Sequence, residues 1–142
     1  MVTGGNGQVA TALKKLNSDL CYEFLSGDDL DICDPQAVGD YFEEIKPRIV
    51  INAAAYTAVD SAEENSESAY RVNKLGPELL AIACDKSEIP LIHLSTDYVF
   101  NGESTIPYAE DAKVCPLGIY GQTKLSGEEA VRARLNEHVI LR

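Results

Sequence analysis

The sequence predicts an α/β fold in which a doubly wound parallel sheet lies between two layers of helices. Short apolar runs alternate along the chain with longer amphipathic stretches, a pattern typical of parallel strands joined by helices. The apolar run Ile49–Ala53 has the character of a strand buried on both faces. A glycine-rich turn at Gly4–Gly7 directly precedes a helical pattern, as it does after the first strand of many such sheets.

The elements follow from local signals in chain order. Helices are predicted over residues 8–15, 35–46, 67–86 and 120–136, and strands over residues 22–25, 49–53, 91–95 and 139–141. The second helix has clear ends, because Asp34 is a typical N-cap, Pro35 suits the first helical position and Pro47 stops the helix. Apolar residues recur along the third helix at Leu75, Leu79, Leu80 and Ala83. Residues 101–117, rich in Gly, Pro and Asp, are expected to form a loop.

Both ends of the predicted sheet are expected to be truncated. Only Met1 and Val2 precede the turn that begins at Thr3, whereas a typical strand has about 5–6 residues. The last apolar run, Val139–Leu141, stops within a strand. We therefore expect a Rossmann-like doubly wound parallel sheet, truncated at both ends, whose first strand is mostly missing.

The composition excludes several classes of function. The net charge of -11 argues against binding a nucleic acid polymer, which requires a basic surface. No apolar run approaches the ~20 residues that span a bilayer, and no signal peptide is evident, so we expect no membrane contact and a cytoplasmic location. The four cysteines and two histidines are scattered without metal-ligand spacing, so no metal site is predicted.

Acidic residues cluster at two places in the sequence. Glu63, Glu64 and Glu67 lie near the start of the third predicted helix, where acids complement the helix dipole. Glu128 and Glu129 are adjacent in the last predicted helix and are expected to be solvated. We interpret both groups as surface charge that aids solubility.

The first motif that points to chemistry is the glycine-rich turn. Gly4 permits a tight turn, Gly7 lets a pyrophosphate approach the backbone, and the small Ala10 permits close packing of helix on sheet. The following helix would present its N-terminus to the phosphates. By itself the motif is weak, because a purely structural turn has the same composition.

The second motif is Tyr120 followed four residues later by Lys124, which places both side chains on one helical face. A free tyrosine has a pKa near about 10. A neighbouring ammonium favours the phenolate and would lower that pKa, which suits general acid–base catalysis near neutral pH. Read alone, this spacing more often describes an exposed tyrosine and a solvated lysine.

Two further motifs follow predicted strands. Thr96 and Asp97 come after the strand at 91–95, where ligands of open α/β sheets bind. Local turn capping by these side chains is the alternative. The run Ala53–Ala55 leaves the strand at 49–53, and its small side chains would let a flat cofactor lie against the backbone. Core packing against the glycine turn is the competing explanation.

Together these motifs resemble the extended short-chain dehydrogenase/reductase superfamily, and within it the dTDP-4-dehydrorhamnose reductase family. The stretches that carry the resemblance include NAAAYTAVD at 52–60, LSTDYVF at 94–100 and PLGIYGQTKLSGE at 116–128. The resemblance implies a NAD(P)-binding Rossmann-like domain over residues 1–142, with the C-terminal substrate-binding part absent. It also implies reduction of the C4 keto group of dTDP-4-dehydro-L-rhamnose to dTDP-L-rhamnose, the last step of dTDP-L-rhamnose biosynthesis.

The resemblance assigns a role to each motif. Tyr120 would protonate the C4 oxygen, Lys124 would assist it and hold the nicotinamide ribose, and Thr96 would hydrogen-bond the reacting oxygen. Thr57 and Asp97, like Thr96, would contact the nucleotide-sugar substrate. The remaining cofactor contacts implied are Gly4, Gly7, Gln8, Val9, Asp31, Ile32, Ala53, Ala54 and Ala55.

Several choices stay open at this point. The cofactor could be NADPH or NADH, because Ser26 and Gly27 close the second strand without an acid for a 2′-hydroxyl or an arginine for a 2′-phosphate. The oligomeric state is open, with a homodimer among the alternatives. Other epimerases, dehydratases or reductases of nucleotide sugars share these motifs. A non-catalytic regulatory subunit resembling the methionine adenosyltransferase β-subunit is a further alternative, although the intact Tyr120, Lys124 and Thr96 favour an enzyme.

Overall fold

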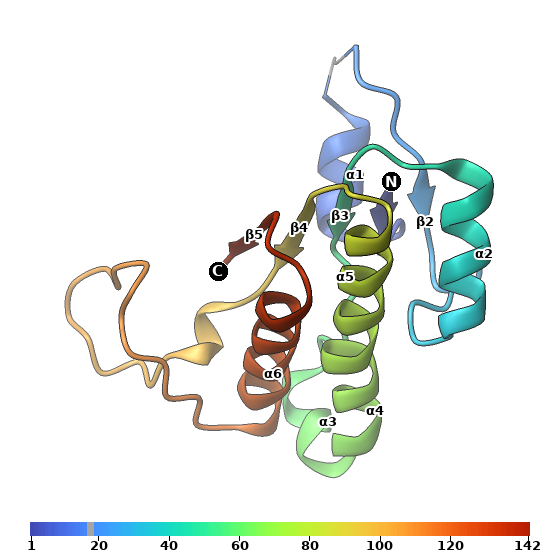
Figure 1. Cartoon of the computed structure of the whole chain (residues 1–142). Coiled ribbons are helices and arrows are strands. Elements are labelled where there is room, and N and C mark those ends of the chain that lie inside the picture. Colours follow the sequence, from blue (N-terminus) through green and yellow to red (C-terminus); the bar gives the residue numbers. More distant parts are fainter. Residues whose placement is uncertain (17–18) are drawn as a thin grey trace.

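Five parallel strands form one sheet in the part of the chain that the computed structural model describes, residues 1–16 and 19–142 (Figure 1). The strands are β1 (Val2–Thr3), β2 (Phe24–Leu25), β3 (Val50–Asn52), β4 (Leu91–Leu94) and β5 (His138–Leu141). Their order across the sheet is β2-β1-β3-β4-β5, and every neighbouring pair is parallel. The order reverses between β1 and β3, and in such sheets ligands bind at the carboxyl ends beside the reversal.

Helices cover both faces of the sheet, which confirms the predicted doubly wound architecture. The helical elements are α1 (Gln8–Lys14), α2 (Pro35–Ile45), α3 (Val59–Glu64), α4 (Ser66–Tyr70), the π-helical turn η1 (Arg71–Leu75), α5 (Gly76–Lys86), the 3-10 turn η2 (Asp97–Val99) and α6 (Ile119–Arg134). The helices α2, α5 and α6 pack side by side on one face, and α1 lies behind the sheet on the other (Figure 1). Residues 100–118 form a long loop that extends away from this layer.

The start of α2 follows the sequence signals closely. The Asp34 carboxylate accepts hydrogen bonds from the backbone N–H groups of Gln36 and Ala37, and Pro35 occupies the first turn. The helix ends at Ile45, and the following Lys46 adopts a left-handed conformation with φ of 47°. Packing of this helix against α5 buries its apolar face over the sheet.

The third predicted helix differs from the expectation in its first half. It begins at Ser66, one residue before the predicted start, and changes to a π-helical turn at Arg71–Leu75 before it continues as α5. Pro77 explains the change, because its ring has no N–H and clashes with the carbonyl four residues earlier, that of Asn73. The short helix α3 was not predicted, because its six residues carry too little apolar periodicity.

The released carbonyl of Asn73 lies against α6. A Cβ atom at Gly127 would be 2.1 Å from this oxygen, so only glycine permits the contact. The backbones of η1 and α6 therefore touch directly. This contact places α6 close to the carboxyl ends of the strands.

The hydrophobic core lies between the sheet and the α2–α5–α6 layer. Val50 and Leu91 of the inner strands are fully buried, as is Leu80 of α5. In the edge strand β5, half-buried residues alternate with exposed ones. Within the described residues, no helix is both long enough and apolar enough to cross a membrane.

Candidate active site

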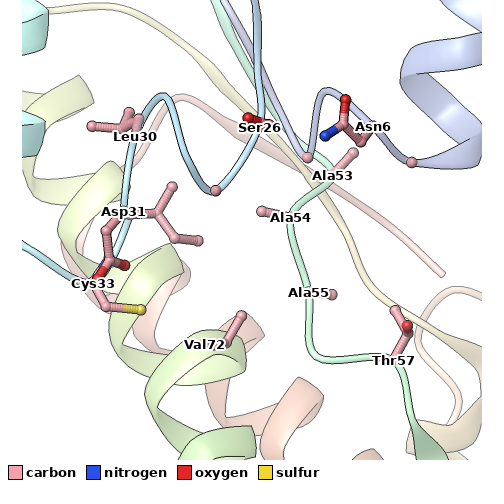
Figure 2. A pocket seen from close by; sticks show the side chains of 14 residues that line it. Asn6, Ser26, Leu30, Asp31, Cys33, Ala53, Ala54, Ala55, Thr57 and Val72 are labelled. Carbon is pink, nitrogen blue, oxygen red and sulfur yellow. The ribbon is translucent and has the colours of Figure 1, made fainter.

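A cavity of about 420 Å³ opens at the carboxyl ends of β1, β2 and β3, where the strand order reverses. Figure 2 shows the segment Ala53–Thr57 along one side, Leu30–Cys33 along the other, and Asn6 of the glycine turn above them. The lining residues are Gly4, Asn6, Gly7, Ser26, Gly27, Leu30, Asp31, Ile32, Cys33, Ala53, Ala54, Ala55, Thr57 and Val72.

The glycine turn is held tightly against the end of β3. Gly4 has a φ of +72°, and a Cβ atom there would lie 2.5 Å from the carbonyl oxygen of Ala53. The N–H of Gly7 donates to the carbonyl oxygen of Gly4 at 2.8 Å and closes the turn. The Nζ of Lys14 also donates to the carbonyl oxygen of Gly5 at 2.9 Å. At Gly4 and Gly7 the turn therefore presents backbone atoms without side chains to the cavity.

A buried hydrogen-bond network fixes the three strand ends beneath the cavity. The Asn52 Oδ1 accepts from the Thr3 hydroxyl at 2.7 Å and from the N–H of Ala54 at 3.2 Å. Because the Ala54 N–H can only donate, the Asn52 Nδ2 must face Nδ1 of His93, 3.1 Å away. His93 therefore carries its proton on Nε2, and that nitrogen is buried without a hydrogen-bond partner.

Asp31 is positioned by its neighbours at the far end of the cavity. Its carboxylate accepts from the N–H of Cys33 at 2.9 Å and from Nη2 of Arg71 at 2.6 Å. The hydrogen bond from Cys33, together with that from Arg71, holds the pKa of Asp31 below its usual value. The ion pair is exposed, so its contribution to stability is small.

Lys124 lies buried on α6, one turn after Tyr120. Only 2 % of Lys124 is exposed, and its Nζ donates to the carbonyl oxygen of Leu94 at 2.6 Å. Burial lowers the pKa of Lys124 to about 8, although the negative charge of Glu128 opposes the effect. This environment departs from that of a solvated surface lysine.

Tyr120 and Asp97 line a second cavity of about 520 Å³. The ring of Tyr120 meets that of Tyr98 edge-on, with centroids 5.4 Å apart. The other lining residues are Val59, Phe100, Asn101, Gly102, Tyr108, Leu117, Gly118 and Gly121. The cavity has mostly apolar walls.

Thr96 caps the 3-10 turn that follows β4. Its hydroxyl accepts from the N–H of Tyr98 at 3.2 Å and donates to the Asp97 carboxylate at 3.2 Å. This is the turn capping that the sequence offered as an alternative to a role in binding. The two roles are compatible, because the hydroxyl is only half-buried and stands at the carboxyl end of the strand.

The predicted site residues divide into groups. Gly4, Gly7, Asp31, Ile32, Ala53, Ala54, Ala55 and Thr57 line the first cavity, and Tyr120 and Asp97 line the second. Thr57, expected at the substrate, therefore lies in the wall expected for the cofactor. Gln8 and Val9 form the first turn of α1 outside the residues that line the first cavity.

Two functional candidates escaped the sequence interpretation. Glu128 was expected to be solvated, but its side chain is fully buried, whereas Glu129 is exposed as expected. Asn73 is also fully buried; its Oδ1 accepts from the N–H of Tyr56 at 2.8 Å, and its Nδ2 donates to the hydroxyl of Thr123 at 3.0 Å. The local sequence gave no signal for either, because their partners, except Arg132 four residues after Glu128, are distant in the chain.

Comparison with known proteins places these features in a family. Residues 1–142 match the family described as RmlD substrate binding domain. The dTDP-4-dehydrorhamnose reductase of Sinorhizobium fredii is 42% identical over 99% of this chain and 48% of its own length. That of Escherichia coli K12 is 37% identical over 100% of this chain and 51% of its own length.

Solved structures agree with the sequence comparison. A dTDP-4-dehydrorhamnose reductase from Clostridium acetobutylicum superposes with a TM-score of 0.94 at 40% identity, over 98% of this chain and 50% of that one. The same enzyme from Bacillus anthracis, solved in complex with NADP, gives 0.91 at 37% identity over the same shares. The chain thus spans about half the length of the relatives that it matches.

Proposed function

Because this chain belongs to the RmlD substrate binding domain family, we propose that its protein reduces the C4 keto group of dTDP-4-dehydro-L-rhamnose to give dTDP-L-rhamnose. Relatives named for that reaction match nearly the whole chain. The observation that carries the proposal is the buried Lys124 one helical turn from Tyr120, at the end of a parallel strand. Burying an ammonium is costly, which favours a functional role for Lys124 over that of a solvated surface lysine.

The first cavity fits a nicotinamide dinucleotide. The close approach of Gly4 to β3 and the alanine run leave room for a flat, extended ligand against backbone N–H groups. A relative from Bacillus anthracis binds NADP. Ser26 and Gly27 carry neither a carboxylate that would repel a 2′-phosphate nor an arginine that would require one, so we expect both NADPH and NADH to serve.

When bound, the cofactor supplies a hydride to the C4 carbon of the keto-sugar. Tyr120 gives its phenolic proton to the C4 oxygen as negative charge develops there. Lys124, one helical turn from Tyr120, would favour the phenolate and donate to the ribose hydroxyls of the bound cofactor, and Thr96 would orient the reacting oxygen. Tyr98 and Leu117 line the mostly apolar cavity beside Tyr120.

Reduction by the full-length protein tests the proposal. NADPH and NADH oxidation is followed with dTDP-4-dehydro-L-rhamnose and with other nucleotide keto-sugars. Absence of turnover with the first substrate would defeat the assignment. A preference for another keto-sugar would move the protein to a different reaction of the same superfamily.

The variant Tyr120→Phe tests the chemical role of the phenol. We expect kcat to fall at least about 100-fold, because general acid catalysis contributes on that scale, while cofactor affinity is retained. Tyr41→Phe is the matched control, since the Tyr41 hydroxyl donates to Glu23 at 3.4 Å in an exposed place on α2. Unchanged kcat in Tyr120→Phe would exclude Tyr120 as the acid.

A further inference from the structure

Three polar residues follow one another at four-residue intervals along α6. Tyr120, Lys124 and Glu128 therefore lie on one face of the helix, a turn apart. The third member is as well buried as the second, since none of the Glu128 side chain is exposed. The proposed reaction uses the first two members and leaves the third without a role.

The Glu128 carboxylate is fully engaged by three side chains. Its Oε1 accepts from the Ser95 hydroxyl at 2.5 Å and from Nε of Arg142 at 2.9 Å. Its Oε2 accepts from Nη2 of Arg142 at 2.7 Å and from Arg132 at 3.0 Å. Burial alone would raise the pKa of Glu128, but the hydrogen bonds from Arg142 and Ser95 hold it below its usual value. The residue is thus a buried anion with its hydrogen bonds satisfied.

The contacts of this helical face meet two consecutive residues at the end of β4, directly before Thr96. Lys124 holds the carbonyl oxygen of Leu94, Glu128 holds the hydroxyl of Ser95, and the next residue is Thr96. Two side chains of α6 therefore fasten the backbone that carries the Thr96 hydroxyl. Both attachments are made by charged groups, whose hydrogen bonds are stronger than those between neutral groups.

We infer that Glu128 is a positioning residue of the reductase site: it ties the end of β4 to α6, so that Thr96 stays aligned with Tyr120, and it keeps the ammonium of Lys124 charged. This inference rests on the proposed function and deepens it. Glu128 touches neither cavity, so it acts through Ser95 and Lys124.

The surroundings of Lys124 explain why Glu128 keeps its ammonium charged. Among the described residues, the ionisable groups beside Lys124 are Tyr120 and Glu128 on its own helix and His93 on β4. Burial keeps the imidazole of His93 neutral, so it supplies no charge. Glu128 is consequently the anion that offsets the desolvation of the ammonium.

Titration of Lys124 tests this role of Glu128 without substrate or cofactor. The full-length protein is labelled with 13C at the lysine Cε, the Lys124 signal is assigned from Lys124→Arg, and its titration midpoint is measured by NMR. We expect Glu128→Gln to lower the midpoint by roughly one pH unit, because a buried opposite charge is removed. Glu129→Gln, one residue away but exposed, is the matched control and should leave the midpoint in place. Equal midpoints in the two variants would overturn the electrostatic role.

The pH dependence of kcat/KM provides a second readout. In Glu128→Gln the fall in kcat/KM at alkaline pH should move to lower pH, whereas a merely structural loss would scale the whole profile. Glu128→Asp should restore part of the shift. A protein that shows no reductase activity still gives the NMR result, so failure of the proposed function and failure of this inference are distinguishable.

Ser95→Ala tests whether Glu128 ties the end of β4 to α6, and it also serves if Glu128→Gln does not fold. It removes one hydrogen bond and leaves both arginine contacts to Glu128 in place. We expect kcat to fall roughly tenfold through misalignment of the reacting groups, with KM for the cofactor and the Lys124 midpoint unchanged. Wild-type kcat in Ser95→Ala would refute the tether between Glu128 and Thr96.

Discussion

Mild acid should destabilise this protein through His93 before its carboxylates are protonated. The imidazole is fully buried and accepts a hydrogen bond from Asn52 at Nδ1. Burial, assisted by the ammonium of Lys124, lowers the pKa of His93 to about 3. An unfolded chain exposes the same imidazole with a pKa of about 6.5.

The size of the effect follows from the two pKa values. Between pH 6.5 and 3 the unfolded state binds a proton that the folded state does not, so the free energy of unfolding falls as the pH falls. The slope is about 1.4 kcal/mol per pH unit for one group. Because the unfolded imidazole begins to bind its proton above pH 6.5 and the slope is partial there, lowering the pH from 7.5 to 4.5 should remove about 3 kcal/mol.

Urea unfolding at pH 7.5 and pH 4.5 measures this loss. The wild-type protein should lose about 3 kcal/mol more between the two pH values than His93→Gln, whose amide can still accept from Asn52 and does not titrate. His138→Gln serves as the control, because that imidazole is only half-buried at the start of β5. Equal losses in wild type and His93→Gln would show that the buried imidazole is not held neutral.

Three further outcomes are expected. Gly4→Ala should weaken cofactor binding and destabilise the fold by at least about 2 kcal/mol, because Gly4 has a positive φ and lies in contact with Ala53. Gly27→Ala is the control in the same cavity wall; a Cβ atom there meets open space, so stability should change by less than about 0.5 kcal/mol. Calorimetric titration of the cofactor and urea unfolding compare the two variants. Asn73→Ala should lower the free energy of unfolding by about 1–3 kcal/mol, because the backbone N–H of Tyr56 loses its acceptor in a partly buried place, and an unchanged free energy of unfolding would contradict this view. The scattered cysteines and histidines of the sequence predict that reductase activity persists in chelator, and its loss would reveal a metal requirement.

Local signals were sufficient for most of the architecture. The cap at Asp34 and the stop at Pro47 located α2, and apolar runs located β3 and β4. The strand expected at 22–25 is shorter, with only Phe24–Leu25 paired to β1. The π-helical turn was missed, although Pro77 could have signalled a break one turn earlier.

The candidate site was predictable where one segment held the whole signal. The spacing of Tyr120 and Lys124 and the glycine turn can be recognised without knowing the fold. Glu128 could not be, because apart from Arg132 one turn away its partners lie 33 residues earlier at Ser95 and 14 residues later at Arg142. A charged residue appears surface-exposed in sequence until the tertiary structure supplies its counter-charges.

The main-chain contact between Asn73 and Gly127 determines how far apart the two walls of the site stand. Asn73 also holds Tyr56, directly after the alanine run that lines the first cavity. Asn73 thus sets the distance between the alanine run and α6, the helix that bears Tyr120. The distance is fixed by direct contact of two backbones, those of Asn73 and Gly127. Side-chain substitutions elsewhere in the core can alter packing without changing this spacing, so related proteins could diversify around a reaction geometry of constant dimensions.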